Sequence, residues 1–473
     1  MTGAPLWTSE EAHAATGGQG PAGWAAQGVS IDTRTLMPGD LFVALMGDSR
    51  DGHAFVADAL KRGAAAALVS QDVPNAAPLL RVGDTLQGLR DLGIAARART
   101  RAKIVAVTGS VGKTSTKEAL RHVLAAIGET HASAASYNNH WGVPLTLARM
   151  APTARYGVFE IGMNHAGEIA PLARMVAPNV AVITTVEPVH LAHFSSVRAI
   201  AEEKGEIFAG LTLDGTAVIN RDNPYYTLLR QKAEAYGARH VLGFGAHSEA
   251  DSRLLDYAPS ETSSKIAALI CGRPLTCVIG SPGRHMALNA LAILAAVHAL
   301  GGDVDRAAHA LADLAPPKGR GVRSRIALPG GAAILIDESY NANPASMRAA
   351  LSLLGATAPG SGGRRIAVLG DMLELGDDAP AYHAALAESV AQERVDLVFT
   401  AGPLMEHLHQ ALPASRRGAH AAQSSEIADL LPRVLKNGDV VMVKGSFGSR
   451  MGLVVDCLKT LASPETSQPG TPN

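Results

Sequence analysis

Residues 107–116 read VTGSVGKTST, and they lie between the β-branched stretch KIVAV at 103–107 and the helix-like stretch that begins at Lys113. A glycine-rich turn between a strand and a helix lets backbone N–H groups converge on a phosphate, and the helix N-terminus adds a favourable partial charge. The spacing is two residues shorter than G-x-x-x-x-G-K-[ST], which disfavours the ordinary P-loop kinases and GTPases. The stretch predicts a strand, a phosphate loop and a helix; the alternative is a chance Gly-Lys-Thr turn.

Each residue type in this loop has a physical use. Gly109 and Gly112 permit the tight backbone, Lys113 neutralises the β and γ phosphates, and the Thr114 hydroxyl ligates Mg²⁺. The sequence thus predicts a nucleotide-binding loop made of Thr108, Gly109, Ser110, Val111, Gly112, Lys113, Thr114 and Ser115.

From about residue 103 onward, short β-branched runs alternate with amphipathic helical stretches, the pattern of βα units in a mostly parallel sheet. A second series of the same kind begins after Pro316 and Pro317, which read as a connector. The pattern predicts an α/β fold with two doubly wound units. The expected strands are 103–109, 157–162, 180–186 and 216–220 in the first unit, and 332–338, 364–370, 396–402 and 439–445 in the second.

A length of 473 residues favours about three domains. The N-terminal part is mixed in pattern and predicts a small α/β domain, and the last residues are rich in Pro, Ser and Thr, which indicates a disordered tail. The expected boundaries are an N-terminal domain at 1–101, a central domain at 102–315, a C-terminal domain at 316–462 and the tail at 463–473.

Composition excludes several classes of protein. Hydrophobic residues at 47% and charged residues at 18% indicate a globular chain, and a net charge of -1 argues against a general nucleic-acid or anionic-membrane surface. Neither a secretory leader nor a bilayer-spanning stretch is visible, so a cytoplasmic protein is expected. The three cysteines, Cys271, Cys277 and Cys457, have no spacing that suggests zinc or stapling, and we interpret them as ordinary buried thiols.

Candidate metal ligands follow two of the predicted strands. Glu160 ends YGVFE and His190 follows VITTVEPV, at the carboxyl ends of strands where open α/β sheets bind ligands. A lone acid or histidine near a strand end is more often a solvated or capping residue than a metal ligand. Lys204 lies among Glu202, Glu203 and Glu206, which favours an exposed helix of mixed charge; an ammonium cannot bind Mg²⁺, whereas a lysine carbamylated by CO₂ could.

Taken together, several stretches resemble the Mur ligases, the ATP-dependent amino-acid- and peptide-adding enzymes of bacterial cell-wall synthesis. The resemblance spans about residues 28 to 455 and implies a UDP-sugar-peptide-binding domain, a central ATPase and a Rossmann-like C-terminal domain. The stretches occur in the family's order: TGSVGKTST, YNNHWGVP, FEIGMNHAGEI, PVHLAHFSS, EEKGEIF, SPGRHMALNA, IDESYNANPASM, LGDMLELG and VKGSFGSRM.

GMNHAGEI and DESYNANPASM are most similar to the branch that joins D-alanyl-D-alanine to UDP-N-acetylmuramoyl-tripeptide. SIDTRTLMPGDLFVAL and DGHAF resemble that branch's UDP-binding domain. The resemblance implies a peptidoglycan-precursor enzyme that uses ATP and two Mg²⁺ ions, forms an acyl phosphate, works as a monomer on small-molecule substrates, and binds neither nucleic acid nor membrane.

Site residues carry over position by position as implications of this resemblance. Lys113 and Thr114 match the phosphate and Mg²⁺ residues, Glu160 and His190 match further metal ligands, and Lys204 matches a lysine that is carbamylated in several members. The remaining matches are Asn138 and Asn139 near the γ-phosphate and substrate carboxylate, where NN alone would read as a turn; Asn289, Arg320, Asp337 and Tyr340 for the nucleotide; Ser30, Asp32, Thr33, Arg34, Asn164 and His165 for the UDP-peptide; and Asn341 and Asn343 for the dipeptide.

Two positions depart from the family pattern. Met286 stands where many relatives have asparagine, which removes one expected nucleotide contact. Ala192 stands where relatives commonly carry an acid, and either His193 or water is then expected to supply the polar group.

Other functions remain open at the level of sequence. A ligase adding a diamino acid should differ around DESYNANP, and a folylpolyglutamate synthetase should lack the N-terminal domain. A nucleotide-dependent binding module without chemistry is the alternative from another class, and the joint presence of Lys113, Glu160, His190 and Lys204 argues against it.

Overall fold

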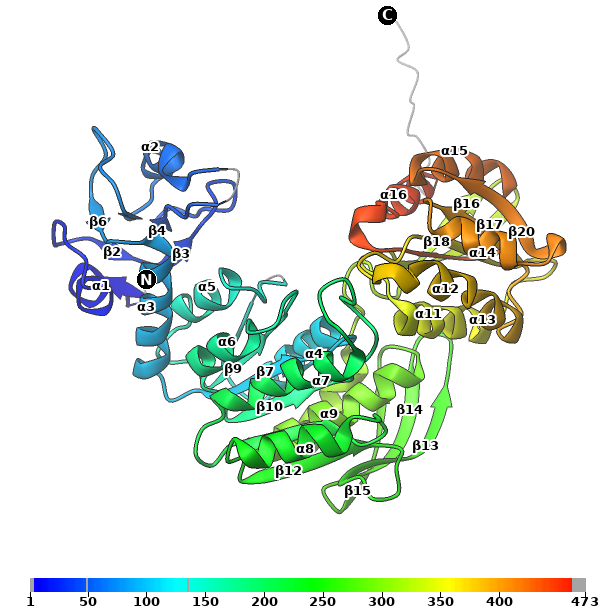
Figure 1. Ribbon diagram of the computed structural model, residues 1–473, viewed down its shortest axis with the longest axis horizontal. Helices are drawn as coiled ribbons and strands as arrows, with labels where there is room; N and C mark the ends of the chain where they lie inside the picture. The colour runs from blue at the N-terminus through cyan, green and yellow to red at the C-terminus, as the bar shows by residue number, and fades with distance from the viewer. Residues whose placement is uncertain (1–3, 48–49, 134–135, 462–473) are drawn as a thin grey trace, which may run out of the picture.

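The structure, a computed structural model, describes residues 4–47, 50–133 and 136–461. The tail expected at 463–473 lies outside the described residues. Three units follow one another along the chain (Figure 1), and each consists of helices packed on a sheet. Most strand pairs in the three main sheets are parallel, with antiparallel pairs at one edge of the central and C-terminal sheets. The predicted three-part α/β fold is confirmed, while the domain boundaries given above stay predictions.

The N-terminal unit is built on a parallel sheet of order β3-β4-β5-β6, with the small antiparallel pair β1-β2 beside it. Its last helix, α3, packs on α5 of the central unit, so the two units share a helical contact. Its elements are β1 (Trp7–Thr8), α1 (Ser9–Thr16), β2 (Ala25–Ala26), β3 (Gly28–Ser30), β4 (Asp40–Val43), η1 (Gly52–Phe55), α2 (Val56–Lys61), β5 (Ala66–Val69), β6 (Leu79–Arg81) and α3 (Thr85–Arg99).

The central unit has the sheet order β15-β14-β13-β12-β11-β10-β7-β9-β8. Its strands from β8 to β13 are parallel, whereas β13, β14 and β15 pair antiparallel, an extension that the βα pattern did not predict. Its elements are β7 (Lys103–Thr108), α4 (Lys113–Ala125), β8 (Thr130–Ala132), α5 (Gly142–Ala148), β9 (Tyr156–Glu160), α6 (Ile169–Val176), β10 (Val180–Ile183), α7 (Val197–Lys204), η2 (Gly205–Gly210), β11 (Thr216–Asn220), α8 (Tyr226–Ala235), β12 (His240–Gly245), β13 (Ser252–Pro259), β14 (Ser264–Ile270), β15 (Arg273–Ile279), α9 (Arg284–Ala299), α10 (Val304–Ala310) and η3 (Leu311–Asp313).

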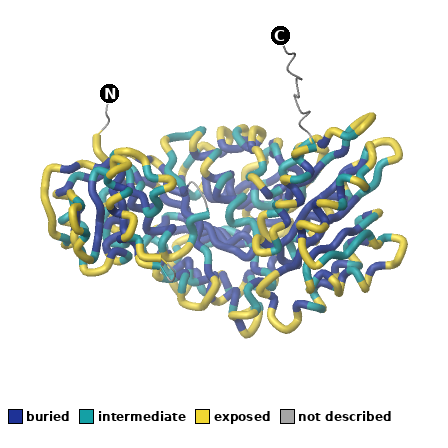
Figure 2. Tube along the Cα trace, turned by 90° about the horizontal axis from the view of Figure 1, so that it is seen from above, coloured by how far each residue is buried: buried dark blue, intermediate teal, exposed yellow. Residues whose placement is uncertain are grey.

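Strand β7 shows why this sheet is buried on both faces. Val105 and Val107 belong to the core under α4 and α9, while Ile104 and Ala106 belong to the core under α6 and η2. Successive side chains of a strand point to opposite faces, so a continuous apolar run suits a strand with helices on both sides. Figure 2 shows buried segments of the chain in the interior and exposed segments around the outside.

The C-terminal unit has the sheet order β16-β17-β21-β18-β19-β20, parallel except for the edge strand β16. Its four predicted strands correspond to β17, β18, β19 and β21; β16 and β20 were not predicted. Its elements are β16 (Val322–Leu328), β17 (Gly331–Glu338), α11 (Pro344–Ala356), β18 (Arg365–Gly370), η4 (Gly376–Asp378), α12 (Ala379–Ala384), α13 (Leu386–Gln392), β19 (Leu397–Ala401), α14 (Met405–Ala411), η5 (Ala414–Arg416), β20 (Arg417–Ala421), α15 (Ser424–Val434), β21 (Val440–Lys444), η6 (Phe447–Ser449) and α16 (Gly452–Thr460).

In the described part of the chain, no helix has both the length and the apolar character needed to cross a bilayer.

The turn from β7 into α4 depends on Gly109 and Gly112. Gly109 has a φ of +150°, and a Cβ there would lie 2.0 Å from Thr184 Oγ1 on the neighbouring strand's end. Gly112 has a φ of +87°, and a Cβ there would lie 3.0 Å from Asn289 Nδ2. The loop is therefore fixed from two sides, by β10 and by α9.

We expect Gly109→Ala to lower the thermal unfolding midpoint and to weaken ATP binding, because the new methyl group would displace Thr184 or the loop. Forced overpacking of this kind costs roughly 1–3 kcal/mol. Gly452→Ala is the matched control, since a Cβ at this helical position meets nothing within 4 Å. Equal midpoints for the two variants, measured by differential scanning calorimetry, would contradict the expectation.

Candidate active site

A cavity of about 670 Å³ lies where the phosphate loop, the carboxyl ends of central strands and the C-terminal unit meet. Thr108 and Gly109, the first two loop residues, are not in its lining, and neither are His165, Lys204, Asp337 or the four N-terminal residues at 30 and 32–34. The predicted residues that line it are Ser110, Val111, Gly112, Lys113, Thr114, Ser115, Asn138, Asn139, Glu160, Asn164, His190, Asn289, Arg320, Tyr340, Asn341 and Asn343.

The phosphate loop holds a partly buried lysine. Lys113 Nζ donates to Gly109 O at 2.7 Å, and burial lowers the pKa of Lys113, while nearby Glu160 raises it and Arg320 lowers it further. Ser110 ties the loop to the segment after β10: its Oγ donates to Glu187 O at 3.0 Å and accepts from Glu187 N at 2.9 Å. The lysine is thus held on a rigid turn in a region of low polarity, where an anion such as a phosphate would stabilise its charge.

Glu160 is the buried carboxylate of the cavity. It is 2% exposed; its Oε1 accepts from Asn138 Nδ2 at 2.7 Å, and its Oε2 has no hydrogen-bond partner. A buried carboxylate oxygen without a partner is costly unless a cation or a donor meets it. Asn139 does something different: its Oδ1 accepts from Gly142 N at 2.9 Å, at the start of α5.

Lys204 is buried, so the prediction that it lies on the exposed face of a helix of mixed charge is wrong. It is 1% exposed at the end of α7, and burial, followed by the charge of Lys113, pushes its pKa well below the ordinary lysine value. Its neighbour Glu203 is used elsewhere, accepting from Gly167 N at 2.9 Å and Ile169 N at 3.1 Å at the start of α6. Among the described residues, no carboxylate lies within ion-pair distance of Lys204 Nζ.

His190 lies at the cavity edge with a φ of +55°. Its Nδ1 lies 2.6 Å from Glu374 Oε2, a residue of the C-terminal unit. Burial is the largest effect and lowers the pKa of His190; Glu374 raises it, and Lys113 and Lys204 lower it. The net lowering favours the neutral imidazole, which is the form that binds metals.

The residues present fit a divalent cation. No group of three or more His, Cys, Asp or Glu side chains in the described residues is placed to hold a metal. Glu160 Oε2 without a partner, a neutral His190 and the hydroxyl of Thr114 nevertheless provide hard or borderline ligands, and a carbamylated Lys204 would add an anionic oxygen. Oxygens of a bound phosphate would complete such a shell.

Besides Glu374, two side chains of the C-terminal unit among the described residues contact the central unit at the cavity. Arg320 Nη2 donates to Thr114 Oγ1 at 3.2 Å, and Tyr340 Oη donates to Ser136 Oγ at 3.2 Å. The Arg320 guanidinium lies over the Tyr340 ring, 4.4 Å from its centroid, which is cation–π geometry. These contacts bring the predicted nucleotide residues of both units to one place.

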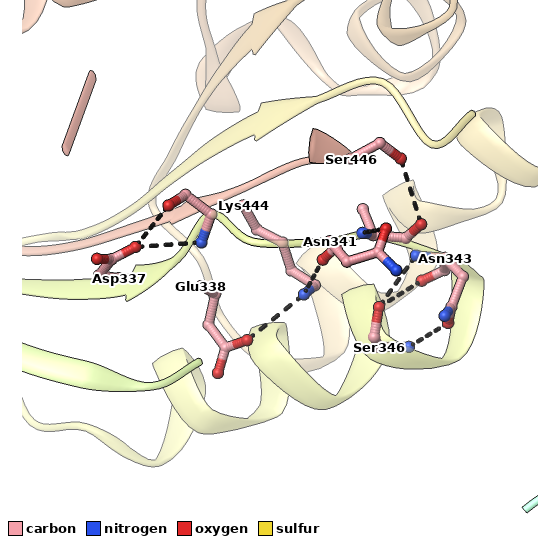
Figure 3. Close-up of polar contacts among 9 residues, drawn as sticks. Asp337, Glu338, Asn341, Asn343, Ser346, Lys444 and Ser446 are labelled. Atoms are coloured by element: carbon pink, nitrogen blue, oxygen red, sulfur yellow. Dashed lines mark hydrogen bonds and ion pairs between the residues drawn. The ribbon is translucent and has the colours of Figure 1, made fainter. Parts of the chain in front are cut away.

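Figure 3 shows the wall that the C-terminal unit contributes. Lys444, which the sequence analysis missed, is 2% exposed and donates from Nζ to Asn341 O at 2.8 Å, with Glu338 Oε2 at 3.4 Å. Asn343 Oδ1 accepts from Ser346 N at 2.9 Å and so caps α11.

Asp337, by contrast, faces away from the cavity, bonded to Ser339 Oγ at 2.7 Å and to Lys459 Nζ at 3.3 Å. Its predicted nucleotide role therefore has no support from its position, whereas its neighbour Glu338 lines the cavity.

The predicted UDP-peptide residues fall into two groups. Ser30 and Asp32 lie at the end of β3, where Asp32 pairs with the exposed Arg34 guanidinium at 2.6 Å, and the structure does not bring them, or Thr33, to the cavity. Asn164 lines the cavity, and His165 next to it packs on His193 with ring centroids 4.4 Å apart.

The two departures from the family pattern have structural settings. Met286 is buried in the apolar core with α9 while also touching the cavity. Ala192 N donates to Glu374 O at 3.4 Å, so the polar neighbour of this loop comes from the C-terminal unit. Glu374 was missed because the motif LGDMLELG gives no sign of where its loop docks.

Models of known protein families match parts of all three units. The Mur ligase family catalytic domain matches residues 26–83, the Mur ligase middle domain matches 107–297, and the Mur ligase glutamate ligase domain matches 324–447.

Individual relatives extend over almost the whole chain. The Escherichia coli K12 protein named "UDP-N-acetylmuramoyl-tripeptide--D-alanyl-D-alanine ligase" is 35% identical over 91% of this chain and 93% of its own length. The crystal structure of MurF from Acinetobacter baumannii has a TM-score of 0.85 at 28% identity, covering 96% of this chain and 99% of that one. MurF ligase from Thermotoga maritima in complex with ADP has a TM-score of 0.77 at 27% identity, covering 92% and 97%.

With the phosphate loop, the cavity and these matches together, the chain belongs to the Mur ligase family of ATP-dependent ligases. Within that family it is similar in particular to the UDP-N-acetylmuramoyl-tripeptide–D-alanyl-D-alanine ligases, known as MurF.

Burial of the Lys204 amine predicts how the free energy of unfolding changes with pH. In CO₂-free buffer, the folded state holds Lys204 with a lowered pKa, so at neutral pH the unfolded chain binds more protons and stability rises with pH. Lys204→Met removes this cost and should raise the free energy of unfolding at pH 7 by roughly 1–3 kcal/mol. The difference should shrink as the pH approaches the ordinary lysine value of about 10.4.

Thermal or denaturant unfolding at pH 7 and pH 9 measures this difference. Lys265→Met, at an exposed position of β14, is the control and should show no such pH dependence. A Lys204→Met protein that is less stable than the wild type at pH 7 would contradict the expected burial cost.

Proposed function

We propose that this chain joins D-alanyl-D-alanine to UDP-N-acetylmuramoyl-tripeptide with ATP, giving the UDP-N-acetylmuramoyl-pentapeptide, ADP and phosphate in peptidoglycan-precursor synthesis. The observation that carries the ligase chemistry is the meeting of the phosphate loop, Glu160 and the C-terminal wall in one cavity. The choice of substrates is supported by the names of relatives that match over nearly the full length.

The reaction must overcome the poor electrophilicity of a carboxylate. The terminal carboxylate of the tripeptide attacks the γ-phosphorus, the bond to the β–γ bridging oxygen breaks, and ADP leaves. The amine of D-alanyl-D-alanine then attacks the acyl phosphate, loses a proton, and phosphate departs as the amide forms.

The cavity residues serve these steps by position and charge. Lys113 and Arg320 stabilise the charge that spreads over the transferred phosphoryl group, and Asn138, held by Glu160, orients the attacking carboxylate. Tyr340, reaching across to Ser136, helps the C-terminal unit exclude water from the acyl phosphate.

Mg²⁺ belongs to the proposal through the ligands that the cavity offers. One ion would be held by Thr114 and a second by Glu160, His190 and carbamylated Lys204. When bound, the ions supply charge neutralisation that lets two anions approach each other. Carbamylation needs a neutral amine, which adds to CO₂ and releases a proton, and the lowered pKa of Lys204 provides that amine.

We expect the protein, incubated with ATP, Mg²⁺, UDP-N-acetylmuramoyl-tripeptide and D-alanyl-D-alanine, to form the pentapeptide and ADP in equal amounts. If the tripeptide carries ¹⁸O in its terminal carboxylate, one labelled oxygen should appear in the released phosphate, because that oxygen bridges carbon and phosphorus in the acyl phosphate. Mass spectrometry measures both products. ATP turnover without pentapeptide, or phosphate free of label, would refute the assignment; a diamino acid in place of the dipeptide is the specificity control.

Lys204→Ala should lose at least about 100-fold in activity, and short-chain carboxylates should restore part of it by occupying the space of the carbamate. Lys232→Ala is a matched control, because Lys232 pairs with Glu206 at 2.6 Å outside the cavity lining. Full activity of the Lys204 variant in steady-state assays would remove this residue from the site.

A further inference from the structure

The loop after β18 is anchored by hydrogen bonds and presents the exposed carboxylate of Glu374. Met372 N donates to His383 Nε2 at 2.9 Å, and Leu373 N donates to Ser446 Oγ at 3.0 Å. Leu375 is 2% exposed and belongs to the core of the C-terminal unit. Between these anchors, Glu374 points outward from a backbone with a φ of +64°.

This loop docks on the segment that carries His190. Glu374 Oε2 lies 2.6 Å from His190 Nδ1, and Glu374 O accepts from Ala192 N at 3.4 Å. Both His190 and Glu374 have positive φ values, an unusual conformation for residues other than glycine, asparagine or aspartate. Such conformations persist where the surroundings impose them and gather at functional sites.

The chemistry of the contact fixes the imidazole. An ionised carboxylate only accepts hydrogen bonds, so Nδ1 of His190 carries the proton in this pair. Nε2 of the neutral ring then keeps its lone pair on a side chain that lines the cavity. A carboxylate behind a histidine ligand sets its tautomer and orientation in this way in many metal sites.

We propose that Glu374 is a positioning residue that, on docking of the C-terminal unit, orients His190 and fixes its Nδ1–H tautomer so that Nε2 serves as a cation ligand. The pairing makes completion of the metal site depend on the docking of a different unit. The inference rests on the proposed function for the identity of the reaction, but the contact itself does not.

The contact between Glu374 and His190 should contribute little to the stability of the fold. The Glu374 side chain is 51% exposed and that of His190 is 24% exposed, and ion pairs open to solvent contribute little to stability. Substitution of Glu374 should therefore leave the thermal unfolding midpoint almost unchanged, and any loss of function should come from the geometry of His190.

The test compares Glu374→Ala and Glu374→Gln in the full chain. Two-dimensional ¹⁵N spectra of histidine-labelled protein, with the signal of His190 assigned through His190→Gln, report the tautomer without any substrate. Steady-state kinetics report the Mg²⁺ concentration needed for half-maximal rate. The expected result for Glu374→Ala is loss of the pure Nδ1–H signature and a rise of about 10- to 100-fold in the Mg²⁺ requirement.

Glu374→Gln should retain most of both properties, since the amide oxygen can still accept from Nδ1–H. Asp377→Asn, an exposed acid three positions along the same loop segment, is the matched control and should behave as wild type. An unchanged tautomer in Glu374→Ala, an unchanged Mg²⁺ requirement, or a uniform loss with a lowered melting midpoint would overturn the proposal. Wild-type protein that forms no pentapeptide would refute the proposed function instead, while the tautomer spectra would still decide the contact.

Discussion

The site depends on two neighbouring lysines, because the charge of Lys113, which is partly buried, acts on the fully buried Lys204. Lys113 and Lys204 both have pKa values lowered first by burial, and the charge of Lys113 also lowers that of Lys204. A protein core tolerates such cations only when they lose a proton or meet an anion. Glu160 is the carboxylate that acts on Lys113, and one of its own oxygens has no partner. The charges of this region are therefore balanced only when phosphates, carboxylates and cations are present together.

That constraint explains the arrangement of the two doubly wound units. The central unit presents the carboxyl ends of β7, β9 and β10 to the cavity, and the C-terminal unit presents those of β17 and β21. Open α/β sheets bind ligands at these ends, so two such edges facing each other enclose ligands from both sides. Arg320, Tyr340 and Glu374 then reach central residues across the boundary, and the buried charges are shielded from water by a second unit rather than by a longer loop.

The sequence predicted what depends on local pattern. The strand–loop–helix at 107–116 and the eight strands named from apolar runs follow from backbone and burial preferences, and they are found in the structure. The antiparallel strands β14 and β15 were missed because their residues alternate between buried and exposed, whereas the predicted strands are continuous apolar runs followed by helices. Features that depend on packing could not be predicted from the residue pattern: the acidic neighbours of Lys204 favoured an exposed helix, and only the family resemblance placed Lys204 in the site. In the structure, Glu203 is bonded to the start of α6 and Lys204 is buried.

Register explains the contrast between Asp337 and Glu338. Both are acids at the end of β17, and successive residues of a strand face opposite sides, so sequence alone does not say which one faces the ligand. Pairing with β21 places Glu338 opposite Lys444, and the two side chains lie at the cavity wall. Tertiary structure also decides the surroundings of Ala192, where the chain lacks an acid. The carboxylate of Glu374 lies against the loop that carries Ala192, and Glu374 is held in place by the core of the C-terminal unit. A polar function that local sequence leaves unfilled can thus be supplied by tertiary contact, because a site needs a group at a point in space and not at a position in the chain.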